Sequence, residues 1–119
     1  KRSHWMWFIF PQIAGLGYSE TARYYAIKDM AEAKAYMEDY TLSSNLIEIS
    51  QALLDVDSDD ATAVMGWPDD LKLKSSMTLF ALVKPECEVF QKVLEKFFHG
   101  EKDQKTIEIL QDKKLGAMW

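Results

Sequence analysis

The stretch "PECEVFQKVLEKFFHG", residues 85–100, carries the clearest helical pattern in the chain. Its apolar residues recur at intervals of three and four positions, which places them on one face of an α-helix. These residues are Val89, Phe90, Val93, Leu94 and Phe97. Pro85 suits the first turn of such a helix, and Gly100 suits the position just beyond its end. The stretch therefore predicts an amphipathic helix that packs against a core.

Similar signals recur along the chain. Asp29 and Glu32 have the spacing of a helix-capping box, and residues 42–54 have apolar side chains at helical spacing. Pro68, followed by two aspartates, predicts a further helix over residues 68–83. Because only brief connections separate these segments, the expected fold is all-α, a compact single domain of about seven short helices.

The ends of two further helices are expected from single polar residues. The acidic stretch "DVDSDD", residues 55–60, interrupts the helical pattern, and Ser58 or Asp59 is expected to cap a short helix after it. Asp103 is expected to cap the last helix, and residues 111–119 are expected to form a tail without periodicity. The domain is thus expected to span residues 1–119.

Composition excludes several classes of function. The chain has 119 residues, a net charge of −5 and one cysteine. An acidic chain lacks the basic surface of a general nucleic-acid binder, so no nucleic-acid partner is expected. The single cysteine rules out an intramolecular disulfide and suits a reducing compartment, so we expect a cytoplasmic protein.

Membrane and metal sites are not expected either. The longest apolar run, residues 5–10, is too short to span a bilayer. The two histidines and Cys87 do not have the spacing of a zinc site, and no cofactor motif is present. We therefore expect no metal, no cofactor and no membrane association.

The aromatic block, "HWMWFIFPQ" at residues 4–12, is apolar on all sides apart from one histidine and one glutamine. A segment of this kind is typical of a buried helical turn or a short strand. His4 is either a packed core residue or a group that acts as a base or donates to a ligand. The block is therefore chiefly a core element with a candidate polar group at each end.

A second unusual stretch, "PDDLKLKSSMTLFA", occupies the helix expected over residues 68–83. Asp69–Lys72 and Asp70–Lys74 have the spacing of intrahelical ion pairs. Three hydroxyl residues follow where the helix should face the core, at Ser75, Ser76 and Thr78. Such hydroxyls either bond back to the preceding helical turn or line a polar pocket. The pattern leaves both alternatives open.

Three stretches follow one another along the chain: "KRSHWMWFIFPQIAGLG", "YYAIKDMAEAKAYM" and "PDDLKLKSSMTLFA". Together they resemble the domain-of-unknown-function family 1810, and the resemblance covers about residues 1–110. The resemblance implies a compact, mostly helical fold of small, chiefly bacterial proteins without an established activity. It also implies that the first family helix is missing before Lys1. Members are often called calpastatin-like, but that inhibition uses disordered segments, whereas this composition is that of a folded core.

The hypothesis favoured by these motifs is a small-molecule or anion-binding module. Its pocket is expected between residues 4–12 and the helix over 68–83, and its ligand is expected to be anionic or nucleotide-like. The aromatic rings would form a flat wall, and the polar groups would contact the ligand. The candidate binding residues are Trp5, Trp7, Gln12, Tyr25, Lys72, Ser75, Ser76 and Thr78.

Two other functions stay open, so the sequence does not decide whether the chain is an enzyme. A hydrolase of an N-glycosidic or nucleotide-like bond would use His4 or Asp69 as acid or base and Lys72 to stabilise negative charge. A protein-interaction domain would expose the aromatic block as an apolar patch. A monomer is favoured.

Overall fold

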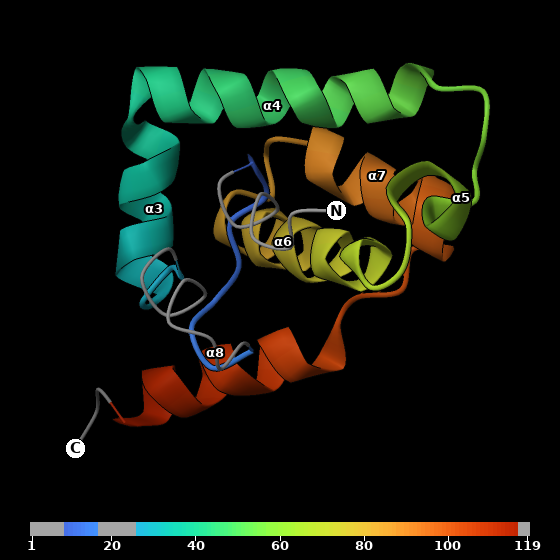
Figure 1. Ribbon diagram of the computed structural model, residues 1–119. Coiled ribbons are helices and arrows are strands. Elements are labelled where there is room, and N and C mark those ends of the chain that lie inside the picture. Colours follow the sequence, from blue (N-terminus) through green and yellow to red (C-terminus); the bar gives the residue numbers. More distant parts are fainter. Residues whose placement is uncertain (1–8, 17–25, 117–119) are drawn as a thin grey trace.

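The computed structural model describes residues 9–16 and 26–116, which are shown with their helices in Figure 1. Six helices, and no strand, lie within these ranges, which confirms the all-α prediction. They are α3 (Met30–Glu38), α4 (Tyr40–Asp55), α5 (Ala61–Met65), α6 (Asp69–Val83), α7 (Val89–Phe98) and α8 (Gln104–Gly116). None of the helices in the described ranges is long and apolar enough to cross a membrane.

Helix α6 lies at the centre of the fold, where α3, α5, α7 and α8 all pack against it. Ten of its fifteen residues are buried, and they include charged and hydroxyl side chains as well as apolar ones. Phe80 joins its neighbours through two tilted ring contacts, to Tyr36 of α3 at 5.4 Å and to Phe90 of α7 at 5.7 Å between centroids. Polar groups on α6 are therefore placed inside the core.

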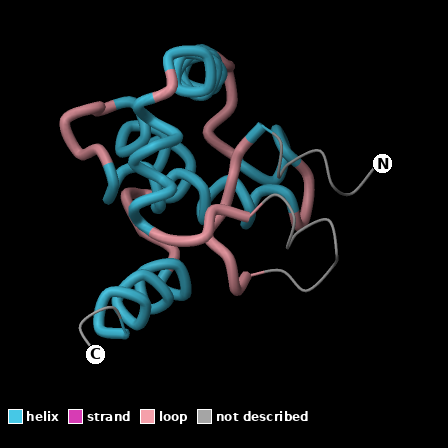
Figure 2. The backbone as a smooth tube through the Cα atoms, turned by 90° about the vertical axis from the view of Figure 1, so that its left-hand side faces the viewer, coloured by secondary structure: helices cyan, strands magenta, loops and turns pink. Residues whose placement is uncertain are grey.

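The outer helices close the fold at opposite ends. Helix α4 lies across α7, and in the side view of Figure 2 it is seen end-on at the top, with α8 at the bottom. The Lys96 ammonium joins α7 to α4 by donating hydrogen bonds to three carbonyls at the end of α4, those of Leu53 (3.0 Å), Leu54 (2.9 Å) and Val56 (2.7 Å). A cation at these carbonyls also suits the negative end of the helix dipole.

The helix predicted over residues 85–98 is present, but it is shorter at its start. Its five apolar residues are all buried against the core, as predicted. Helix α7 begins at Val89 because residues 85–88 form a turn, in which the Cys87 N–H donates to the Lys84 carbonyl at 3.0 Å. At the other end His99 adopts a left-handed conformation and the Gly100 N–H bonds the Leu94 carbonyl at 2.9 Å.

Two predictions of helix ends need correction. The cap of α5 is Asp60 rather than Ser58 or Asp59, because its carboxylate accepts hydrogen bonds from Thr62 and Ala63 N–H at 3.0 and 3.2 Å. Helix α8 continues to Gly116, so the residues after Gln111 extend the helix and do not begin a tail there.

The caps predicted at Asp29 and Asp103 are present. Asp29 accepts from the Glu32 N–H at 2.9 Å, and Glu32 accepts in return from the Lys28 N–H at 2.8 Å. Asp103 accepts from the N–H and the hydroxyl of Thr106 at 3.0 and 2.6 Å. These bonds satisfy amide groups that the first turn of a helix leaves without partners.

The segment of residues 9–16 runs past α6 to α8 (Figure 1). Phe10 and Ile13 belong to the same buried apolar cluster as Leu79 and Phe80 of α6. An isolated parallel bridge joins Ile13 to Ile27, with hydrogen bonds of 2.8 Å on either side of Ile13. This segment brings the C-terminal end of the aromatic block into the core.

Candidate functional site

One face of α6 carries the candidate polar residues together, as their spacing predicts. Asp69, Lys72 and Ser76 follow one another at three and four positions, which is one side of a helix. The Lys72 ammonium lies 3.7 Å from the Asp69 carboxylate. Asp69 is 2 % exposed and Ser76 is fully buried, whereas the Lys72 side chain keeps 26 % of its surface exposed. This side of α6 therefore carries a partly exposed cation, Lys72, and a buried hydroxyl, Ser76.

Ser75 and Thr78 use their hydroxyls within the fold. Ser75 donates to the Leu71 carbonyl at 3.2 Å, and Thr78 donates to the Lys74 carbonyl at 2.8 Å. The Thr78 oxygen also accepts from the Asp103 N–H at 2.8 Å, which ties α6 to the start of α8. Both hydroxyls therefore bond back to the preceding helical turn, which is one of the two alternatives that the sequence leaves open for them.

Ser76 and Gln12 differ from these residues. Among the described residues, the Ser76 hydroxyl and the Gln12 side-chain nitrogen are buried and have no hydrogen-bond partner. Gln12 is 2 % exposed, and its main chain is held by the bond from the Ile27 N–H. Leaving such a group unsatisfied costs about 1–3 kcal/mol, so two of them need a reason.

The second predicted ion pair of α6, Asp70–Lys74, does not form. Asp70 accepts instead from the Thr62 hydroxyl at 2.6 Å, which joins α6 to α5. Lys74 pairs with Glu101 at 2.7 Å, and the hydrogen bond from this ammonium lowers the pKa of the Glu101 carboxyl. Partners from other elements replace the helical neighbour in both cases, because α6 is surrounded by the rest of the fold.

Part of the aromatic block lies outside the described residues. This part includes His4, Trp5 and Trp7, and the candidate Tyr25 also lies outside the described ranges. The described end of the block, from Phe10 to Gln12, is buried. Within the described part of the chain, the block is a core element and not an exposed patch.

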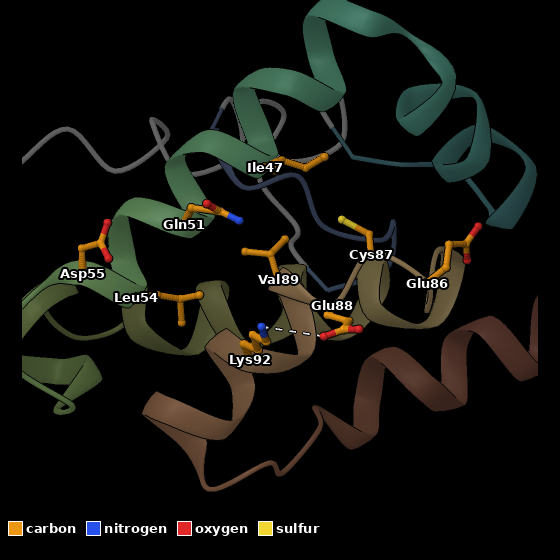
Figure 3. Close-up of a pocket in the computed structure, with 9 residues that line it drawn as sticks. All are labelled: Ile47, Gln51, Leu54, Asp55, Glu86, Cys87, Glu88, Val89 and Lys92. Carbon is orange, nitrogen blue, oxygen red and sulfur yellow. Dashed lines mark ion pairs between the residues drawn. The ribbon is translucent and has the colours of Figure 1, made fainter.

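Two surface cavities lie beside α4. One, of about 290 Å³, has Ile9 from the aromatic block and Tyr36 from α3 on its wall. Burial raises the pKa of the Tyr36 phenol, and the negative charge of Asp39 adds to this effect. The other, of about 330 Å³, lies between α4 and the start of α7 and includes Cys87 (Figure 3). The sequence reasoning missed both cavities, because their walls come from separate elements.

The described residues hold no group of three or more histidine, cysteine, aspartate or glutamate side chains that suits a metal ion. Buried carboxylates are present, but each is engaged by a neighbour in its own part of the fold. Asp69 lies beside Lys72, and Asp70 accepts from Thr62.

Comparison with known proteins agrees with this fold. The sequence model of the family described as "Protein of unknown function (DUF1810)" matches residues 1–110. The chain belongs to the DUF1810 family. No curated protein matches the chain.

A solved structure has the same DUF1810-like fold. It is the crystal structure of the conserved hypothetical protein Rv1873 from Mycobacterium tuberculosis, which is 41 % identical in sequence. The match has a TM-score of 0.89 and covers 93 % of this chain and 79 % of that chain. This similarity supports the helical arrangement, and the description of Rv1873 names no ligand or reaction.

Proposed function

We propose that this protein is a small-molecule-binding module whose site lies on the Asp69–Lys72–Ser76 face of α6, with Gln12 as a further contact. The observation that supports the proposal is the pair of buried polar groups, Ser76 Oγ and Gln12 Nε2, that have no partner among the described residues. A ligand that hydrogen-bonds these two groups would recover the free energy that their burial costs.

The charges of this face favour a ligand with an anionic group. The Lys72 side chain keeps 26 % of its surface exposed, and its positive charge would attract a phosphate or carboxylate. Asp69 already shares this positive charge at 3.7 Å, so charge alone gives weak binding. Selectivity would therefore come from hydrogen bonds to Ser76 and Gln12, and nucleotides and phosphorylated sugars are suitable first probes.

The test is a thermal-shift screen of the wild-type chain beside two single variants. Ser76→Ala removes the hydroxyl that has no internal partner, and Ser75→Ala removes a neighbouring hydroxyl that bonds back to Leu71. We expect a nucleotide or sugar phosphate at millimolar concentration to stabilise the wild type and Ser75→Ala, but Ser76→Ala much less. A ligand that stabilises all three equally, or a screen without any stabilising ligand, would contradict the proposal.

A second proposal is a hydrolase of N-glycosidic or nucleotide-like bonds. The buried Asp69 carboxylate beside the Lys72 ammonium supports it, since an acid or base next to a cation suits this chemistry. The test is hydrolysis of nucleosides and nucleotides by the wild type and by Asp69→Asn. Hydrolysis that Asp69→Asn retains in full would exclude this role for Asp69.

We also propose a cytoplasmic location in a bacterial cell. The single cysteine supports this location because it suits a reducing compartment.

A further inference from the structure

The cavity between α4 and α7 has both apolar and acidic residues in its wall. Its middle is apolar, formed by Ile47 and Leu54 of α4 and by Val89 and the Cys87 side chain across from them. Figure 3 shows Val89 and Cys87 between the two ends of the cavity, with the Gln51 amide turned toward them. Its volume of about 330 Å³ is at the lower end of the range for small-molecule sites.

Carboxylates occupy the two ends of this cavity. Asp55, the last residue of α4, lies at one end, and Glu86 lies at the other (Figure 3). Glu88 also lines the cavity, but Lys92 is 3.7 Å from it and balances its charge. Asp55 and Glu86 therefore give the cavity its net negative charge.

Neither Asp55 nor Glu86 forms an ion pair or a side-chain hydrogen bond with another described residue. Lys96 caps the carbonyls at the same end of α4 without pairing with Asp55. Lys84 borders a smaller neighbouring cavity together with Glu86, again without an ion pair. A carboxylate at the end of α4 is also unfavourable for the helix dipole, so a cation bound there would be stabilised.

The wall that α4 contributes to the cavity is elongated. It extends from Ile47 to Asp55, which are eight residues apart, or about 12 Å along the helix axis. A ligand that contacts both ends needs a positive charge at each end and an apolar chain between them. From this complementarity we propose that the α4–α7 cavity binds a linear alkyl polyamine, with its terminal ammonium groups at Asp55 and Glu86.

Two direct measurements test this proposal, with spermidine as the probe. Calorimetric titration at low ionic strength gives the affinity for spermidine and for the shorter diamine putrescine. Cys87 is the chain's single cysteine and lines the cavity, so its rate of alkylation by N-ethylmaleimide reports occupancy of this site alone. We expect spermidine to bind more tightly than putrescine and to slow the alkylation of Cys87.

The variant Asp55→Asn/Glu86→Gln removes both end charges, and Glu48→Gln/Glu108→Gln makes the same change of net charge at exposed positions outside the cavity. We expect the first variant to bind spermidine about tenfold more weakly, equivalent to about 1.4 kcal/mol, and the second to bind as the wild type does. The preference for spermidine over putrescine should also disappear only in the first variant.

All four positions are exposed, so both variants should fold, and circular dichroism verifies this. Equal weakening in the two double variants would show attraction to the overall charge of the chain and would overturn the proposal. Alkylation of Cys87 at an unchanged rate under saturating spermidine would also overturn it.

Discussion

Replacing Ser76 with alanine should make the free protein more stable. The Ser76 hydroxyl is fully buried and has no partner among the described residues, so the folded state bears its desolvation cost of about 1–3 kcal/mol. Removing one oxygen from a packed helix leaves a very small cavity, and alanine favours helix more than serine does. We therefore expect the free energy of unfolding to rise by about 1 kcal/mol, and the melting temperature to rise by about 4 °C.

Urea unfolding followed by tryptophan fluorescence measures this change, with Ser75→Ala as the matched control one residue away. Replacing Ser75 removes its hydrogen bond to the Leu71 carbonyl, but alanine favours the helix more than serine does. These two effects oppose each other, so stability should change by less than about 0.5 kcal/mol. A Ser76→Ala variant that is less stable than the wild type by 1 kcal/mol or more would show that the hydroxyl has a stabilising partner. That result would remove the main support for a ligand site on this face.

Three further predictions concern the fold. Lys96→Met should lower the free energy of unfolding in urea by about 2 kcal/mol, since it removes a charged donor to three carbonyls at the end of α4. An unchanged free energy of unfolding would contradict this role of Lys96. Asp60→Ala should lower the free energy of unfolding by about 1 kcal/mol, because a helix cap is lost, whereas Asp59→Ala should lower it little. Because Lys74 lowers the pKa of Glu101, the wild type should be more stable than Glu101→Gln at neutral pH. This difference should vanish as the pH falls through that lowered pKa, and acid titrations in urea measure it.

The sequence was sufficient to predict the helical fold, because local patterns determine it. The stripe of Val89, Phe90, Val93, Leu94 and Phe97 predicts α7 and its buried face, and the structure has both. The Asp29 and Asp103 caps are also local signals, since each side chain bonds an amide three residues later. The sequence predicts the cap of α5 at Ser58 or Asp59, one or two residues before Asp60, because the consecutive residues 57–60 all have a side chain that can cap a helix.

The candidate site was predictable only in part. Spacing places Asp69, Lys72 and Ser76 on one side of α6, and the Asp69–Lys72 pair forms as predicted. Ser75 and Ser76 look alike in the sequence, but only the Ser75 hydroxyl donates a hydrogen bond to the preceding helical turn. This difference depends on the surroundings of each side chain, which the sequence does not show.

Partners that lie far apart in the sequence were not predictable. Lys74 and Glu101 are 27 positions apart, and their pairing depends on how α7 and the loop after it pack beside α6. The α4–α7 cavity was missed for the same reason, since its carboxylates Asp55 and Glu86 come from different elements that the fold brings together.

The side-chain amide signal of Gln12 in an NMR spectrum tests the central claim most directly. In the free protein its Nε2 protons have no hydrogen-bond partner among the described residues, so they should resonate upfield of an ordinary bonded amide. On addition of a ligand that stabilises the wild type, we expect this signal to move downfield as the amide begins to donate. A stabilising ligand that shifts other signals while leaving the Gln12 amide unchanged would contradict the proposed site.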